Sequence, residues 1–178
     1  MAHFDNLYRS NMGVFDALFD NRWVLSGSKA VKEYLDLLGM INEFDFVSSD
    51  VDIHVVSDKI MSEPRIHLRN EITLHREQSN PTRSMTFEDD DNKIDIDFVP
   101  GMKFINIGGL KVEAPENLLR SYLEDLDVRD NIYDQIKIEA LRIIIEHPDI
   151  QRIPRHNISV KRQRNDRIGD NTVKKLSF

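Results

Sequence analysis

The prediction of the fold class starts from the stretch DVDIHVV at residues 50–56, in which polar and apolar residues alternate. A period of two predicts a strand with one apolar face and one polar face. Asp50 and Asp52 are two residues apart, so their carboxylates leave the same face of the sheet. His54 lies on the same face as these carboxylates, and we expect it to be solvated or hydrogen-bonded.

A second acidic strand is predicted at residues 93–99, KIDIDFV, where the same alternation recurs. Its carboxylates are Asp95 and Asp97, which again share one face. Three carboxylates that converge from neighbouring strands repel one another unless a divalent cation neutralises them. Because the chain has no Cys and these ligands are all oxygens, the pattern indicates Mg²⁺ or Mn²⁺ rather than zinc.

A Gly-Ser turn precedes the first acidic strand. The apolar run Trp23–Leu25 ends at Ser26-Gly27-Ser28, and a helix is predicted from Lys29 to Leu38 with Gly39 as its cap. Glycine lets the backbone approach a phosphate, while the Ser28 hydroxyl and the free amides of the helix N-terminus can donate to it. The turn and the carboxylates together predict a site for a metal-bound nucleoside triphosphate.

The rest of the chain alternates between helical and strand patterns. A helix is predicted near residues 4–19, strands at Ile66–Arg76 and Arg83–Phe87, a hairpin within Phe104–Val112, and helices from Ala114 onward and over Ile132–Glu146. This order predicts an α+β fold in which a mixed β-sheet is flanked by helices.

Length and composition favour one ordinary globular unit. The chain has 178 residues, of which 40% are hydrophobic and 31% charged, which excludes disordered and fibrous classes. Without Cys, disulfides and thiolate catalysis are also excluded. No apolar run is long enough for a membrane span and no secretory signal is visible, so we expect a cytoplasmic protein without membrane contact.

The net charge of −7 is unevenly distributed. Residues 151–178 carry eight basic and two acidic residues, whereas residues 1–150 carry 16 basic and 29 acidic ones. This shift predicts a folded domain over 1–150 and a basic tail over 151–178, which either solubilises the end of the chain or binds nucleic acid through phosphate contacts. The candidate nucleic-acid contacts are Arg155, Lys161, Arg162, Arg164 and Arg167.

Taken singly, each motif is also typical of something ordinary: an Asp-x-Asp pair of a solvated strand edge, and a Gly-Ser turn of a capped helix. In their order along the chain, they resemble the nucleotidyltransferases of the DNA polymerase beta-like superfamily. The resemblance rests on Leu25–Ser28, Ser49–Ile53 and Lys93–Pro100. It implies that an acceptor attacks the α-phosphate of a nucleoside triphosphate and that pyrophosphate leaves.

The same resemblance implies roles for the carboxylates. Asp50 and Asp52 would hold two metal ions, and Asp95 would be the third carboxylate, a shared ligand that also serves as a candidate general base. Asp97 is the second choice for that position. Gly27 and Ser28 would contact the triphosphate. Lys29 would add positive charge there, although a lysine is also typical of a solvated helix surface.

The segment Val112–Leu119, with a later helix that holds Lys137, is similar to AbiEii-like minimal nucleotidyltransferases, a group that includes toxins of toxin–antitoxin pairs. The resemblance covers roughly residues 22–145 and adds Lys137 to the candidate nucleotide-binding residues. The acceptors that it implies are the end of a tRNA or another RNA, a protein hydroxyl or a small molecule.

Two other functions are kept open. A gap of 21 residues separates Ser28 from Asp50, which favours a catalytically inactive member of the fold that binds nucleotide, nucleic acid or a protein partner. Alternatively, the acidic body mimics nucleic acid and binds a partner protein. Neither the nucleotide, the acceptor nor the oligomeric state follows from the sequence.

Overall fold

The computed structural model describes residues 7–45, 50–77, 83–128 and 131–160 of the chain. The helices are α1 (Leu7–Ser10), α2 (Met12–Leu18), α3 (Gly27–Leu37), α4 (Pro115–Val128), α5 (Ile132–Glu146) and α6 (Pro148–Gln151), with a 3₁₀ turn at Ile41–Glu43. The strands are β1 (Trp23–Ser26), β2 (Val51–Val56), β3 (Arg65–Leu68), β4 (Ile72–Arg76), β5 (Ser84–Glu88), β6 (Lys93–Val99), β7 (Gly101–Ile107), β8 (Leu110–Glu113) and β9 (His156–Ser159).

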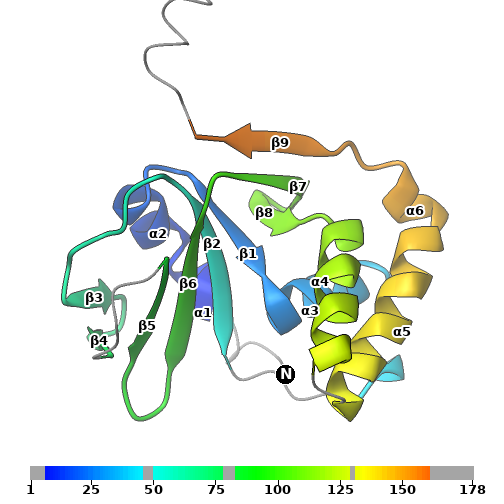
Figure 1. Cartoon of the computed structure of the whole chain (residues 1–178), viewed down its shortest axis with the longest axis horizontal. Helices are drawn as coiled ribbons and strands as arrows, with labels where there is room; N and C mark the ends of the chain where they lie inside the picture. The colour runs from blue at the N-terminus through cyan, green and yellow to red at the C-terminus, as the bar shows by residue number, and fades with distance from the viewer. Residues whose placement is uncertain (1–6, 46–49, 78–82, 129–130, 161–178) are drawn as a thin grey trace, which may run out of the picture.

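One mixed sheet contains all nine described strands, in the order β3-β4-β5-β6-β2-β1-β8-β7-β9 (Figure 1). At its centre, β2 runs antiparallel to β1 and parallel to β6, and β5 runs antiparallel to β6. Helix α3 packs against β1, β2 and α5, while α4 lies beside α5. This arrangement confirms the predicted α+β class with a mixed sheet flanked by helices.

The central strands divide the sheet into an apolar and a polar face. Ile53 on β2 and both Ile94 and Ile96 on β6 are completely buried, whereas Asp52 and Asp95 on the opposite face are only partly buried. This is the alternation that the sequence predicts for strands packed on one side. The polar face therefore presents a row of carboxylates instead of core residues.

Helix α3 begins at Gly27, earlier than the predicted Lys29, and ends at the predicted cap. Gly39 has a φ of +71°, its N–H donates to the Asp36 carbonyl at 3.1 Å, and the Met40 N–H donates to the Leu35 carbonyl at 2.7 Å. This is the Schellman pattern of a helix end, in which a glycine in the left-handed region satisfies the last carbonyls.

Two predicted elements are each divided in the structure. The single strand predicted at Ile66–Arg76 is the β3–β4 hairpin, because Asn70 and Glu71 adopt positive φ values of 64° and 59° and turn the chain. The predicted first helix is interrupted at Asn11, which is buried and whose side chain donates to the Leu7 carbonyl and accepts from the Arg69 N–H, both at 2.8 Å. The backbone of Asn11, with a φ of −119° and a ψ of 21°, leaves the helical region at this point.

The folded body continues past the boundary predicted at residue 150. Strand β9 pairs antiparallel with β7, and the Val160 N–H donates to the Pro100 carbonyl at 2.9 Å. The first part of the predicted tail therefore belongs to the sheet, and residues 161–178 lie outside the described residues. None of the described helices has both the length and the apolar character needed to span a membrane.

Candidate functional site

A row of polar side chains crosses four neighbouring strands on the polar face. In register, Ser26 on β1 lies opposite Asp52 on β2, Asp52 opposite Asp95 on β6, and Asp95 opposite Thr86 on β5. The Thr86 hydroxyl donates to Asp95 Oδ1 at 2.7 Å. Residues directly opposite on paired strands have their Cβ atoms roughly 5 Å apart, so these groups form one continuous row.

A second row lies one step along the same strands. His54 on β2 is opposite Asp97 on β6, which is opposite Ser84 on β5. His54 Nε2 lies 3.5 Å from Asp97 Oδ2, and the Ser84 hydroxyl donates to the same carboxylate. The hydrogen bond from His54 lowers the pKa of Asp97. Burial alone would lower the pKa of His54, but Asp97 and Glu113 outweigh it and raise that pKa.

The Gly-Ser turn packs directly against Asp52. Gly27 has a φ of +67°, and a Cβ placed on it would overlap the Asp52 carboxylate, at 2.8 Å from Cγ and 2.9 Å from Cβ. Only glycine allows this approach, because any side chain would displace the carboxylate. The N-terminus of α3, an 11-residue helix, therefore lies beside the carboxylate row. A helix N-terminus can bind an anion, and here that anion would lie next to a metal held by the carboxylates.

Asp52 is the electrostatic centre of the site. Burial, followed by the negative charges of Asp95, Asp50 and Asp97, raises its pKa from 3.8 to about 7. This shift means that the polar face cannot hold all its carboxylates ionised without cost. Asp50 is partly buried at the bend immediately before β2, so the predicted pair does enter the same electrostatic cluster.

The helices form the other wall of the site. Tyr122 on α4 is buried and shares a side-chain hydrogen bond with Ser28, and burial raises its pKa well above the usual range. The Lys137 ammonium on α5 lies 5.3 Å from the centre of the Tyr122 ring and 3.9 Å from Asp134 Oδ1. The structure thus brings Lys137 close to Ser28 through Tyr122, while Lys29 is buried in the first turn of α3.

Sequence reasoning missed Glu113, the last residue of β8. Glu113 is 4% exposed, its Oε1 accepts from the Ser26 hydroxyl at 2.5 Å, and the same oxygen lies 3.8 Å from His54 Nδ1. Burial raises the pKa of Glu113. The residue fixes the start of the Gly-Ser turn from a neighbouring strand. A charged residue at the end of an apolar strand could have indicated this, but position alone does not distinguish it from a solvated strand end.

The carboxylate donors fit a hard divalent cation in chemistry, because Asp50, Asp52 and Asp95 offer only oxygens. Within the described parts of the chain, however, no three Asp, Glu or His side chains are arranged to hold a metal ion as they stand. Thr86 donates to Oδ1 of Asp95, so Oδ2 is the oxygen with which Asp95 would share a metal with Asp52. Asp97, predicted as an alternative ligand, accepts a hydrogen bond from the Ser84 hydroxyl and pairs with His54.

Of the five predicted nucleic-acid contacts, the structure describes Arg155. Arg155 binds the Glu116 carboxylate through Nε at 3.1 Å, and its Nη1 donates to the carbonyls of Ile150 and Ile153 at 2.9 and 2.8 Å. Its guanidinium is therefore engaged in holding the α6–β9 connection to α4. Lys161, Arg162, Arg164 and Arg167 lie outside the described residues.

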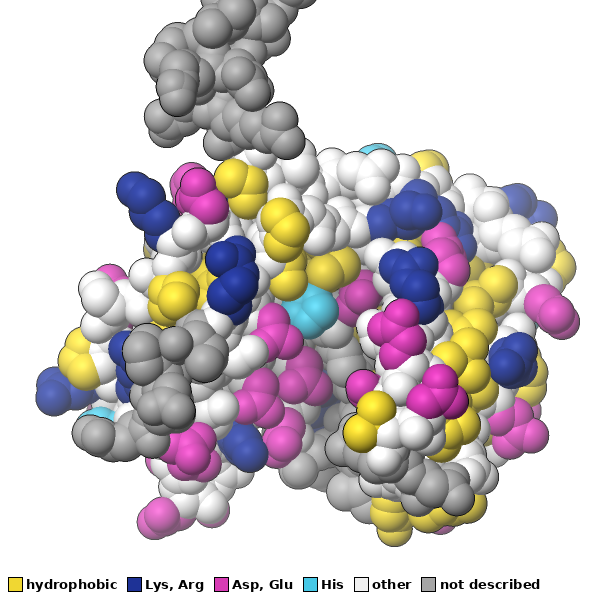
Figure 2. Space-filling view, in the orientation of Figure 1, with side chains coloured by type: hydrophobic (Ala, Val, Ile, Leu, Met, Phe, Trp, Pro, Cys, Tyr) yellow, Lys and Arg dark blue, Asp and Glu magenta, His cyan; other side chains and the backbone are white. Residues whose placement is uncertain are grey.

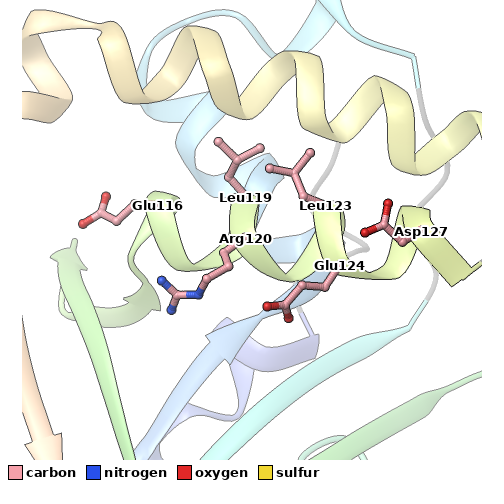
Figure 3. A pocket seen from close by; sticks show the side chains of 6 residues that line it. All are labelled: Glu116, Leu119, Arg120, Leu123, Glu124 and Asp127. Atoms are coloured by element: carbon pink, nitrogen blue, oxygen red, sulfur yellow. The ribbon is translucent and has the colours of Figure 1, made fainter.

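The surface around the row is hollowed. Figure 2 shows acidic side chains and a histidine facing a hollow between the strands of the sheet and the helices α4 and α5. A distinct pocket lies along α4, lined by Glu116, Leu119, Arg120, Leu123, Glu124 and Asp127 (Figure 3). That pocket contains none of the row's residues and is formed by a single helix. We place the candidate site at the carboxylate row, where groups from several elements converge.

Comparison with known proteins leaves the predicted resemblance untested. No protein-family model matches the chain, nor does any curated protein or solved structure. The three motifs on which the resemblance rests lie on β1–α3, β2 and β6, which are adjacent in the sheet. The membership itself stays a prediction.

Proposed function

We propose that this protein is a nucleotidyltransferase that uses Mg²⁺ or Mn²⁺ to move a nucleoside monophosphate from a nucleoside triphosphate onto a hydroxyl group. The observation that supports this most is the contact between Gly27 and Asp52. It places a helix N-terminus against a partly buried carboxylate, and Asp95, the neighbour of Asp52 on β6, is also acidic. An anion cradle beside metal-binding carboxylates is the arrangement that a metal-bound triphosphate requires.

The nucleotide would lie against the start of α3. The Ser28 hydroxyl and the amides that follow Gly27 can donate to phosphate oxygens. Tyr122 holds Ser28 from the helical wall, and Lys137 over the Tyr122 ring adds positive charge on that side. Lys29, which is buried, is a further candidate for this charge.

The carboxylates would hold the metal. Asp50 and Asp52 are the proposed ligands on the nucleotide side, and Asp95 is the ligand on the acceptor side and the candidate general base. When bound, a divalent cation neutralises the carboxylate cluster and stabilises charge on the attacking and leaving oxygens. The hydroxyl acceptor would approach from the β5 side, where Asp95 can receive its proton.

The acceptor class stays broad in this proposal. An RNA end, a protein hydroxyl and a small molecule all offer the required hydroxyl. Residues 161–178 carry six basic and two acidic residues, a composition that would attract a nucleic-acid acceptor to an otherwise acidic body.

A transfer assay tests the proposal. The protein is incubated with each of four α-labelled ribonucleoside triphosphates, Mg²⁺, and either RNA with a free 3′ hydroxyl or whole-cell extract, and both label transfer and pyrophosphate are measured. The Asp50→Asn/Asp52→Asn variant should fall to background. The matched control is Asp90→Asn, in the exposed β5–β6 turn, which should keep wild-type activity. Undiminished transfer by the folded double variant would overturn the proposal.

A second candidate is a nucleotide-binding protein without turnover. The observation that favours it is that the protein's own Thr86, Ser84 and His54 contact the side chains of Asp95 and Asp97. Calorimetric titration separates the two functions: Mg²⁺-dependent triphosphate binding with no pyrophosphate release under any acceptor condition would favour this one.

A further inference from the structure

A hydroxyl group of the chain itself occupies the acceptor end of the candidate site. Thr86 is partly exposed on β5, and its Oγ1 donates to Asp95 Oδ1 at 2.7 Å. A general base must lie within hydrogen-bond distance of the proton that it removes. A hydroxyl that already donates a hydrogen bond to a carboxylate meets this condition. The proposed function uses Asp95 for that purpose.

The order of groups along the row matches the order of atoms in the reaction. The anion cradle at Gly27 stands at one end, Asp52 and Asp95 lie in the middle, and the Thr86 hydroxyl stands at the other end. Neighbouring strands are roughly 4.8 Å apart, so Thr86 lies two strands, about 10 Å, from Asp52. In an in-line displacement the leaving pyrophosphate and the attacking oxygen lie on opposite sides of the phosphorus, as the two ends of this row do.

We propose that Thr86 is a site of self-modification, onto which the protein transfers a nucleoside monophosphate. This inference rests on the proposed function, because the nucleoside triphosphate is its co-reactant. Thr86 Oγ1 forms a bond to the α-phosphorus, the bond from that phosphorus to the bridging oxygen of the pyrophosphate breaks, and the hydroxyl proton passes to Asp95. The products are a phosphodiester on Thr86 and pyrophosphate.

Other hydroxyl groups near the site are less suitably placed. The Ser84 hydroxyl donates to Asp97, which already pairs with His54. Ser26 is 6% exposed and donates to Glu113, at the end of the row where the pyrophosphate would leave. Ser28 belongs to the same end. Thr86 alone among these combines exposure, a hydrogen bond to the candidate base and a position opposite the leaving group.

Mass spectrometry of the whole chain tests the proposal. The purified protein is incubated with Mg²⁺ and each of the four ribonucleoside triphosphates, and its intact mass is compared with that of protein isolated directly from the expressing cells. Trypsin releases residues 84–93 as one peptide, since Arg83 precedes it and Lys93 ends it. Fragmentation of that peptide separates an adduct on Thr86 from one on Ser84.

The expected result is one nucleoside monophosphate per chain, located on Thr86, that is lost in Thr86→Val and kept in Thr86→Ser. Thr73→Val on β4, where the hydroxyl lies 3.2 Å from His67 and away from the row, is the matched control and should keep the adduct. An adduct that persists in Thr86→Val would overturn the inference.

The failure of this inference can be told apart from failure of the proposed function. If the protein labels an added acceptor or releases pyrophosphate while the 84–93 peptide stays unmodified, the self-modification is wrong and the nucleotidyltransferase proposal stands. If neither label transfer nor Mg²⁺-dependent triphosphate binding is detected by calorimetry, both are wrong.

Discussion

Replacing Gly27 by alanine tests the close approach on which the site depends. The substitution has two costs. A non-glycine residue at a φ of +67° costs about 1–2 kcal/mol, and a Cβ that would stand 2.8 Å from Asp52 Cγ adds an overpacking cost of about 1–3 kcal/mol. We therefore expect the free energy of unfolding to fall by about 2–5 kcal/mol.

Gly39→Ala is the matched control for this prediction. Gly39 has a nearly identical φ of +71°, but nothing lies within 4 Å of the position of its Cβ. Urea unfolding of both variants, with shared slopes, isolates the contact cost as the difference between them. Adding Asp52→Ala to Gly27→Ala should recover part of that difference, because the carboxylate is gone. Equal losses for Gly27→Ala and Gly39→Ala would refute the packing of the turn against Asp52.

Three further predictions concern charge, metal and the C-terminal connection. The pKa of Asp52 is raised to about 7, so the metal-free folded protein keeps a proton there that the unfolded chain releases near pH 4. The free energy of unfolding should therefore fall as the pH rises from 5 to 8. In urea titrations at each pH, Asp52→Asn should remove on the order of 2–3 kcal/mol of that fall. Mn²⁺ or Mg²⁺ should raise the melting temperature of the wild type and of Asp97→Asn but not of Asp95→Asn, and equal responses of the two variants in thermal scans would count against Asp95 as the ligand. Arg155→Ala should lower the free energy of unfolding by about 1–3 kcal/mol, because it removes a charge-assisted pair and two hydrogen bonds to carbonyls. Arg152→Ala removes an exposed ion pair and should change that free energy by under about 0.5 kcal/mol. Similar losses in the two variants would contradict the role given to Arg155.

Elements with a clear period were predictable from the sequence. The strand Lys93–Val99 and the helix Ile132–Glu146 have the predicted bounds, and the hairpin predicted within Phe104–Val112 is formed by β7 and β8, which turn at Gly108 and Gly109. In each case the hydrophobic pattern stops at a residue that ends the element. These residues are a proline after β6, a proline after α5 and two glycines between β7 and β8.

Other features depend on contacts that a period does not encode. The turn between β3 and β4 has Glu71 as well as Asn70 at positive φ, which is uncommon for glutamate, so Asn70 is the one residue there that is typical of a turn. Strand β9 has no apolar alternation and is held by pairing with β7 and by Arg155. Because its own sequence has no strand pattern, this strand was predicted as part of the basic tail.

In the candidate site, too, some residues were predictable from the sequence and others depend on tertiary contacts. The carboxylates of the central strands were predictable because they alternate with core residues. Glu113 was missed, since its partners Ser26 and His54 come from β1 and β2, far from it in the chain. Tyr122 lies on the helix predicted from Ala114 onward, but its hydrogen bond with Ser28 depends on how α4 packs over α3, which the helix pattern does not encode.

Binding of a non-hydrolysable nucleoside triphosphate, measured by calorimetry with and without Mg²⁺, tests most directly whether the Gly27 turn and the carboxylate row form one site. We predict binding that requires Mg²⁺, is lost in Asp50→Asn/Asp52→Asn and is retained in Asp90→Asn. Binding that is indifferent to Mg²⁺ or unchanged in the double variant, or no binding of any of the four nucleotides, would contradict it.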